Sequence, residues 1–212
     1  MSTPKQQYYE NLADTLIEKF NKRGIEGYYC ENKEEALLTA KRFLTPGCSV
    51  SWGGSMTLEE IGLIGYLKNS DYTVFDRATA TTQEEKDALY AEVSHCDYYF
   101  MSSNAITLDG QLVNIDGLGN RVASLIHGPK NVVIVAGMNK VVKDVDTAID
   151  RVHNESAPPN AVRLGLDTPC AKYGYCCNCL SPDCICCETV ITRKSRIAGR
   201  IKVILVGETL GY

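Results

Sequence analysis

The sequence has 212 residues, of which 44% are hydrophobic and 23% are charged, and its formal net charge at pH 7 is −4. These values are typical of a soluble globular protein with one domain, or with one domain and a small appendage. The negative charge argues against a broad nucleic-acid-binding surface, which is normally basic. No run approaches the roughly 18 apolar residues of a membrane span, and we expect a cytoplasmic protein with no membrane contact.

Helical and extended patterns alternate along most of the chain. Residues 1–22 predict an amphipathic helix, because apolar side chains recur at steps of three and four residues. Thr57 and Glu60 form a capping box that places the start of another helix at about residue 58. The predicted helices cover residues 1–22, 33–43, 58–67, 83–94 and 144–152, and the predicted strands cover residues 24–29, 48–52, 71–75, 98–101, 132–136 and 201–206. This alternation predicts an α/β protein with a mostly parallel sheet between helical layers.

The stretch from residue 98 to residue 121 combines a strand, a hairpin and a glycine loop. Two short runs, residues 105–107 and 111–114, are separated by an Asp109-Gly110 pair. Such a pair is a strong hairpin signal and favours a tight primed turn, which requires positive φ angles. The glycine loop that follows opens a predicted helix. We therefore expect an antiparallel hairpin beside the mostly parallel sheet.

Three polar loops follow strand ends, at residues 53–55, 102–104 and 137–140. Ligands of open α/β sheets bind outside the carboxyl ends of the strands, so we expect these loops to converge on one pocket. The backbone N–H groups of the glycine loops and the charges of Arg121 and Lys140 favour a small anion there. The predicted ligand-binding residues are Gly53, Gly54, Ser55, Asn104, Asn114, Asp116, Gly117, Gly119, Asn120, Arg121 and Lys140.

Each of these assignments has a structural alternative. Asn, Asp and Gly are common turn formers whatever the function of a loop. The alternative for Arg121 is an ion pair with Asp116, and the alternative for Lys140 is a solvated position at the surface. Glu59 and Glu60 would repel a phosphate from the preceding glycine loop unless they point away. No Ser-His-Asp or Cys-His set is recognisable by spacing, so no catalytic residue is assigned.

Seven of the ten cysteines lie between residues 170 and 187. Such density in a cytosolic protein indicates metal or redox chemistry rather than structural disulfides. The run contains a C-x2-C pair, Cys176 and Cys179, and four thiolates would complete a zinc site or hold an iron–sulfur cluster. The alternative is a surface loop with free thiols. The spacing does not decide between zinc and iron.

The cysteines belong to residues 157–195, which we predict to be an excursion from the domain. The sequence Ala157-Pro158-Pro159-Asn160 predicts a break in the chain, and residues 162–164 predict a short strand. Because a strand returns at residues 201–206, we treat residues 1–212 as a single domain with this excursion before its last strand.

Several motifs stand in order along the chain. They are Trp52-Gly53-Gly54-Ser55, Ser103-Asn104-Ala105-Ile106-Thr107-x-Asp109-Gly110, Asn114-x-Asp116-Gly117-x-Gly119-Asn120-Arg121-Val122-Ala123, Gly137-x-Asn139-Lys140 and Thr168-Pro169-Cys170. Together they resemble the motifs of the LUD-domain family, the lactate-utilization proteins. The resemblance extends from about residue 5 to the end of the sequence.

The resemblance implies a Rossmann-like α/β fold similar to that of the NagB/RpiA/CoA-transferase group. It also implies a link to bacterial L-lactate oxidation, in which family members accompany iron–sulfur subunits. The metal-ligand set that the resemblance implies is Cys170, Cys176, Cys179 and Cys186. The cysteines that depart from the family pattern are Cys177, Cys184 and Cys187.

Three hypotheses follow for the function. The first is a subunit or component of lactate utilization that binds a small anionic ligand in the predicted pocket. The second is an iron–sulfur electron-transfer protein, or a zinc-stabilised one, through the cysteines of residues 170–187. The third, by fold analogy alone, is a transferase or isomerase. The expected partners are iron–sulfur oxidoreductase subunits and a further copy of the same chain.

Overall fold

The structure is a computed structural model that describes residues 3–212, so the first two residues of the predicted helix 1–22 lie outside the described part. The helices are α1 (Pro4–Lys22), α2 (Lys33–Phe43), α3 (Met56–Glu60), α4 (Leu63–Lys68), α5 (Gln83–Val93), α6 (Asn120–Ile126), α7 (Val145–Arg151), α8 (Ala157–Arg163) and α9 (Pro169–Tyr173). Short 3-10 turns are η1 (Arg77–Thr79) and η2 (Met138–Lys140), and η3 (Val152–Ser156) is a π-helical turn. The strands are β1 (Glu26–Cys30), β2 (Ser49–Trp52), β3 (Thr73–Phe75), β4 (Tyr98–Met101), β5 (Ala105–Thr107), β6 (Leu112–Asp116), β7 (Asn131–Gly137), β8 (Val141–Val142), β9 (Glu188–Thr192) and β10 (Ile201–Val206).

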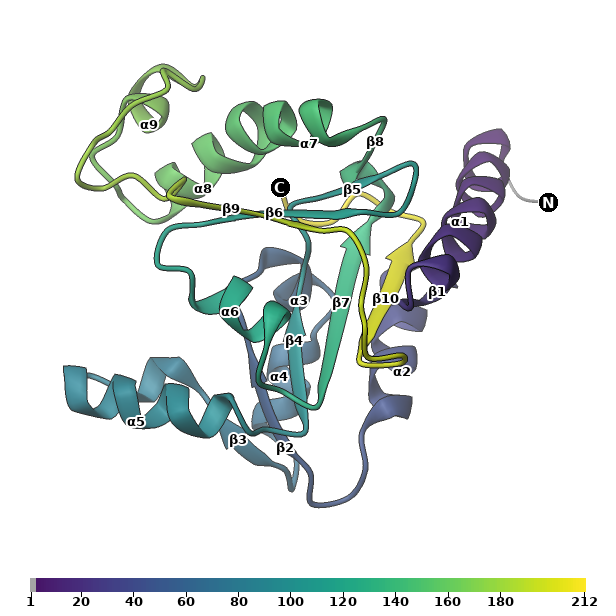
Figure 1. The fold of residues 1–212 in the computed structure, drawn as a ribbon, viewed down its shortest axis with the longest axis horizontal. Helices are drawn as coiled ribbons and strands as arrows, with labels where there is room; N and C mark the ends of the chain where they lie inside the picture. The colour runs from purple at the N-terminus through teal and green to yellow at the C-terminus, as the bar shows by residue number, and fades with distance from the viewer. Residues whose placement is uncertain (1–2) are drawn as a thin grey trace.

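The larger of two sheets has six strands in the order β1-β10-β7-β4-β2-β3, and every neighbouring pair is parallel. Its inner strand β7 is buried from Val132 to Ala136, as its run of apolar residues predicts for a strand covered on both faces. Because all strands run the same way, their carboxyl ends meet at one edge (Figure 1). The prediction of an α/β fold with a mostly parallel sheet is confirmed.

Helices cover both faces of this sheet and form two separate cores. On one face Phe20 of α1 and Leu125 of α6 pack in one cluster with Ile134 of β7. On the other face Leu58 of α3 packs in a second cluster with Val133, the preceding residue of β7. Successive side chains of a strand point to opposite faces, so this single strand contributes to both cores.

A smaller sheet of four strands, β8-β5-β6-β9, lies across the carboxyl edge of the larger one (Figure 1). Its strands β5 and β6 are the predicted antiparallel hairpin. Helix α7 packs against it, where Ala148 joins Ala105 and Val113 in a third apolar cluster. The smaller sheet therefore closes off the edge at which the polar loops of the larger sheet emerge.

The hairpin turn differs from the predicted primed turn. Gly110 has a φ of +86°, but Asp109 keeps a negative φ, so the two-residue primed turn is not formed. The Gly110 N–H instead donates to the Thr107 carbonyl at 2.8 Å. The chain needs positive φ only at the glycine, and the loop is longer than predicted.

Three predictions were wrong, one about the helix at residues 58–67 and two about residues 157–164. The helix predicted over residues 58–67 is broken at Gly62, whose φ is +74°, and Ser55 rather than Thr57 caps its first half. Ala157 to Asn160 do not break the chain, because the prolines occupy the first turn of α8, where a missing N–H costs nothing. The predicted strand 162–164 is the end of that helix. Residues 157–195 also hold β9, which pairs antiparallel with β6.

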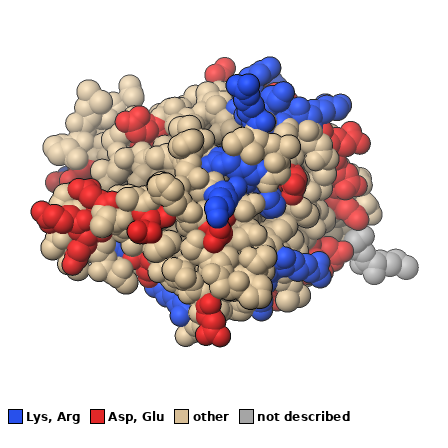
Figure 2. Space-filling model, turned by 60° about the horizontal axis from the view of Figure 1, so that its bottom comes forward, with Lys and Arg blue, Asp and Glu red and all other residues tan. Residues whose placement is uncertain are grey.

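The surface carries both signs of charge. On the face that Figure 2 presents, acidic and basic side chains gather in separate groups with uncharged surface between them. Within residues 3–212, no helix combines the length and the apolar character that a membrane crossing requires.

Candidate functional site

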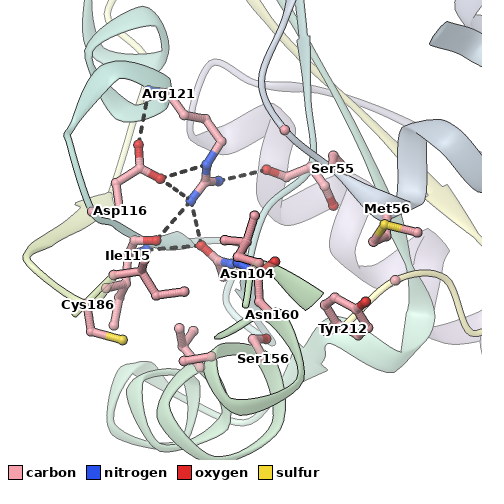
Figure 3. A pocket seen from close by; sticks show the side chains of 18 of the residues that line it. Ser55, Met56, Asn104, Ile115, Asp116, Arg121, Ser156, Asn160, Cys186 and Tyr212 are labelled. Atoms are coloured by element: carbon pink, nitrogen blue, oxygen red, sulfur yellow. Dashed lines mark hydrogen bonds and ion pairs between the residues drawn. The ribbon is translucent and has the colours of Figure 1, made fainter. Parts of the chain in front are cut away.

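A pocket of about 390 Å³ lies between the carboxyl edge of the larger sheet and the smaller sheet. Its walls come from the loop after β2, the loop after β4, the loop after β6, η2 and α8. In Figure 3, Ser55, Asn104, Asp116 and Tyr212 surround the same hollow, although they are far apart in the sequence. The three polar loops therefore converge, as expected for loops that follow parallel strands.

Most of the predicted ligand-binding residues line this pocket. Those that line it are Gly54, Ser55, Asn104, Asp116, Gly117, Asn120, Arg121 and Lys140. Those that do not are Gly53, Asn114 and Gly119. Gly53 has a packing role, because a Cβ there would come within 3.0 Å of the Arg121 side chain. Gly119 begins α6 with a φ of +73°, which favours glycine.

Arg121 lies at the centre of a hydrogen-bond network that fixes the wall of the pocket (Figure 3). Its guanidinium donates to Asp116 Oδ1 at 2.8 Å, to Asn114 Oδ1 at 2.5 Å and to Asn104 Oδ1 at 2.7 Å. Two further N–H groups reach the carbonyls of Ser102 and Ile115, each at 3.1 Å. All five N–H donors of a guanidinium are thereby used by the protein.

This geometry gives Arg121 a structural role, and its role as an anion ligand stays a prediction. The Asp116 carboxylate also accepts from the backbone N–H groups of Arg121 and Val122, at 3.0 and 3.2 Å. Asn114 is fully buried and contacts only protein groups among the described residues. The ion pair that sequence reasoning held as the alternative is the one observed.

Lys140 is not the solvated lysine that the structural alternative described, because its residue exposure is only 4%. Its Nζ donates to Thr57 Oγ1 and to Ser102 Oγ, each at 3.0 Å. No carboxylate lies within 4.0 Å of this Nζ in the described part of the chain. Burial, and next the charges of Arg151 and Arg121, lower the pKa of Lys140 to about 7.

The positive charge around Lys140 comes from several elements. Arg151 of α7 is 5% exposed, and its guanidinium donates to the carbonyl of Asn104 at 2.8 Å and to Ser156 Oγ at 2.8 Å. Among the residues that line the pocket, four are basic and one is acidic: Arg77, Arg121, Lys140 and Arg163 against Asp116. The carboxylate of Asp116 is already bound by Arg121, so the pocket keeps a net positive charge.

Sequence reasoning missed several residues of the pocket. Arg77 follows β3, and its guanidinium lies against Gly54, where a Cβ would be 2.6 Å from Nη2. Tyr90 of α5 accepts from Asn120 Nδ2 at 3.0 Å through its hydroxyl oxygen. Arg163 and Tyr212 come from segments that carried no ligand signal. Nothing local in the sequence marks these residues, because their place depends on how distant elements pack.

The metal site predicted at the cysteines of residues 170–187 stays a prediction. All ten cysteines are free, and within residues 3–212 no group of three or more His, Cys, Asp or Glu side chains is arranged to hold a metal ion. Protein groups hold two of the predicted ligands, since the Asn178 N–H donates to Cys176 Sγ at 3.4 Å and Cys170 Sγ contacts Thr168 Oγ1 at 3.3 Å. Burial, with the charges of neighbouring thiols, raises the pKa of Cys186 to about 12.

Comparison with known proteins places this geometry in a family. The family model described as the LUD domain matches residues 13–206. The chain belongs to the LUD domain family. A structure of a DUF162 family protein from Deinococcus radiodurans resembles this LUD domain with a TM-score of 0.55 and 13% identity, covering 93% of this chain and 98% of that one.

Two further structures resemble parts of this LUD domain. Chaetomium thermophilum eIF2B beta matches with a TM-score of 0.38 and 15% identity, over 54% of this chain and 44% of that one. Plasmodium falciparum ribose 5-phosphate isomerase matches with a TM-score of 0.33 and 17% identity, over 52% of each chain. No curated protein matches the sequence. At the family level the LUD domain is associated with lactate utilization.

Proposed function

We propose that this LUD domain is a component of bacterial L-lactate oxidation that binds a small organic anion in the pocket around Lys140. The observation that carries the proposal is a buried lysine that faces a pocket and has no carboxylate partner within 4.0 Å in the described chain. A buried charge without a counter-ion is costly, and a bound carboxylate would supply the counter-ion. Lactate and pyruvate are small enough for a pocket of about 390 Å³.

Anion binding and protonation of Lys140 are thermodynamically coupled, so each favours the other. A bound carboxylate favours the charged form of the amine, so it raises the Lys140 pKa above its free value of about 7. Affinity is therefore highest below pH 7 and falls as the pH rises through the pKa of the bound state. The same linkage predicts proton uptake on binding near neutral pH.

Calorimetric titration tests the proposal with lactate, pyruvate, coenzyme A and nucleotides as separate probes. We expect lactate or pyruvate to bind the wild type at pH 6.5, and Lys140→Met to bind at least about tenfold more weakly, which corresponds to about 1.4 kcal/mol. Methionine keeps the length and the packing of the side chain and removes only the amine.

Lys143→Met is the matched control, because the Lys143 side chain is 81% exposed and pairs only with its neighbour Asp144. We expect this variant to bind like the wild type. The proposal fails if neither lactate nor pyruvate binds the wild type, or if Lys140→Met and Lys143→Met bind equally well.

A second proposal concerns the cysteine segment. The charges of Cys184, Cys176 and Cys170 contribute to the raised pKa of Cys186, and the Cys186 N–H donates to Cys184 Sγ at 3.4 Å, which supports a shared site for the thiols of this segment. Thiolates of this number suit an iron–sulfur cluster or a zinc ion, which would supply electron transfer or rigidity. Anaerobic purification with iron, sulfide and zinc analysis tests it. A protein that carries none of these in stoichiometric amount rules it out.

The cellular location, the protein partners and the oligomeric state are also proposals. A component of lactate oxidation would act in the cytoplasm beside iron–sulfur oxidoreductase subunits, and a homo-oligomer is the further assembly that we expect. Co-purification of the tagged chain from a lactate-grown host tests the first, and light scattering tests the second. A transferase or isomerase activity remains a prediction by fold analogy only.

A further inference from the structure

Within residues 3–212, the hydrogen bonds of Lys140 Nζ account for two N–H groups and no more. Thr57 donates its own hydroxyl proton to the Leu210 carbonyl at 3.3 Å, and Ser102 donates its proton to the Ser103 carbonyl at 3.3 Å. Both hydroxyl oxygens therefore act as acceptors toward Nζ. A neutral amine has two N–H groups and one lone pair, so it satisfies both acceptors and keeps its lone pair free.

The surroundings hold the amine in this position. Gly211 passes close to it, because a Cβ there would lie 3.3 Å from Nζ and 2.7 Å from Thr57 Oγ1. η2 places Lys140 directly after β7, at the carboxyl edge of the larger sheet. Lys140 lines the pocket although its residue is almost fully buried, so a ligand bound in the pocket lies beside it.

We propose that Lys140 forms a reversible imine with the carbonyl group of a small 2-oxo acid bound in this pocket. The proposal rests on the proposed function and adds a covalent step to it. Buried lysines with a lowered pKa are the nucleophiles of Schiff-base chemistry, since only the neutral amine attacks a carbonyl. The lowered pKa of Lys140 supplies that neutral form near pH 7, in equilibrium with the charged form that a bound carboxylate favours.

The chemistry balances without an oxidant or a reductant. The Nζ lone pair forms a bond to the carbonyl carbon, and the carbonyl oxygen takes one proton from the nitrogen to give a carbinolamine. The hydroxyl group then leaves as water with the second proton of the nitrogen, and a carbon–nitrogen double bond remains. The net change is one amine and one carbonyl converted to one imine and one water.

The charges of the pocket select a carbonyl compound that also carries an anionic group. The imine nitrogen then takes up a proton from solvent, and a negative charge beside it favours this protonated form because the neighbouring Arg151 and Arg121 already add positive charge. The carboxylate next to the carbonyl of a 2-oxo acid supplies this charge within one small molecule. Lactate has the carboxylate but no carbonyl, so it can bind and cannot form the imine.

Reductive trapping tests the inference on the full chain. The protein is incubated with pyruvate and cyanoborohydride, and the adduct is located by intact mass and peptide mapping. We expect one adduct per chain, on Lys140, at least tenfold more than on any other lysine. Lactate should give none. Lys143→Met should be labelled like the wild type, and Lys140→Met should lose the adduct.

The results of calorimetry and of trapping distinguish a failure of the imine from a failure of the proposed function. If calorimetry shows pyruvate binding and no adduct forms at Lys140, the imine is wrong and anion binding stands. Labelling spread evenly over the exposed lysines also overturns the imine. If neither pyruvate nor lactate binds, the proposed function fails and the imine fails with it. Because the site is mapped in the wild type, the test does not depend on the folding of Lys140→Met.

Discussion

At the scale of single residues, the two cations predicted as anion ligands have different surroundings in the site. Arg121 was predicted to bind the anion, but its donors are all used by side chains and carbonyls of the pocket wall. Lys140, for which a solvated position was the alternative, is buried against Thr57 and Ser102. The motifs identified both residues. They did not assign the roles, because the partners of Lys140 lie 83 and 38 residues away in the sequence.

The network around Arg121 predicts a loss of stability on substitution. Arg121 and Asp116 have side-chain exposures of 12% and 9%, so Arg121→Met leaves a buried carboxylate without its cation. We expect the free energy of unfolding to fall by about 3–5 kcal/mol. Urea denaturation followed by circular dichroism measures it.

Arg163→Met is the control for this prediction. Arg163 lines the same pocket but is exposed. Among the described residues it donates only to the side chain of Asn160, three positions earlier in the chain. Its substitution should change the free energy of unfolding by no more than about 0.5 kcal/mol. Equal stability of Arg121→Met and the wild type would contradict the structural role of Arg121.

At the scale of elements, the amino ends of three neighbouring strands are joined by one side chain. Asp97, just before β4, accepts from the Ser49 backbone N–H at 2.8 Å, from Ser49 Oγ at 2.9 Å and from Lys130 Nζ at 2.8 Å. Asn131 of β7 donates to the Asp97 carbonyl at 3.0 Å. The hydrogen bonds from Lys130 and Ser49 lower the pKa of Asp97 to about 2.

These contacts of Asp97, which we call the Asp97 clamp, predict a pH-dependent contribution to stability. The pKa of Asp97 is lower in the folded state than its ordinary value of 3.8, so the stabilisation is present above about pH 4 and is lost as the pH falls toward 2. After allowance for solvent screening, since the side chain is 31% exposed, Asp97→Asn should cost about 1–2 kcal/mol at pH 7. Denaturation at pH 7, 4 and 2 measures the difference from the wild type, which should shrink below pH 4.

The exposed Asp71 provides the control as Asp71→Asn, which should leave stability unchanged at each pH. A cost for Asp97→Asn that stays constant from pH 7 to pH 2 would contradict the clamp.

At the scale of the whole molecule, local patterns predicted the larger sheet better than the smaller one. The β-branched run of β7 and the alternation of helices and strands were sufficient for the parallel sheet and its two helical layers. Strand β9 was missed because it follows the cysteines and pairs with the distant β6, and its burial is only partial. Arg163 on α8 and Tyr212 after β10 reach the pocket only through the packing of distant elements, so they could not be recognised before the fold was known.

Lys140 is a buried amine, and we propose that a bound anion is the counter-ion of its charged form. Carbon NMR of the chain labelled at the lysine ε-carbons measures its titration directly, with and without lactate. We predict one lysine that titrates near pH 7, that is missing from Lys140→Met and that moves to higher pH when lactate is added. The account is contradicted if every lysine titrates near its ordinary value of 10.5, or if no lysine responds to lactate.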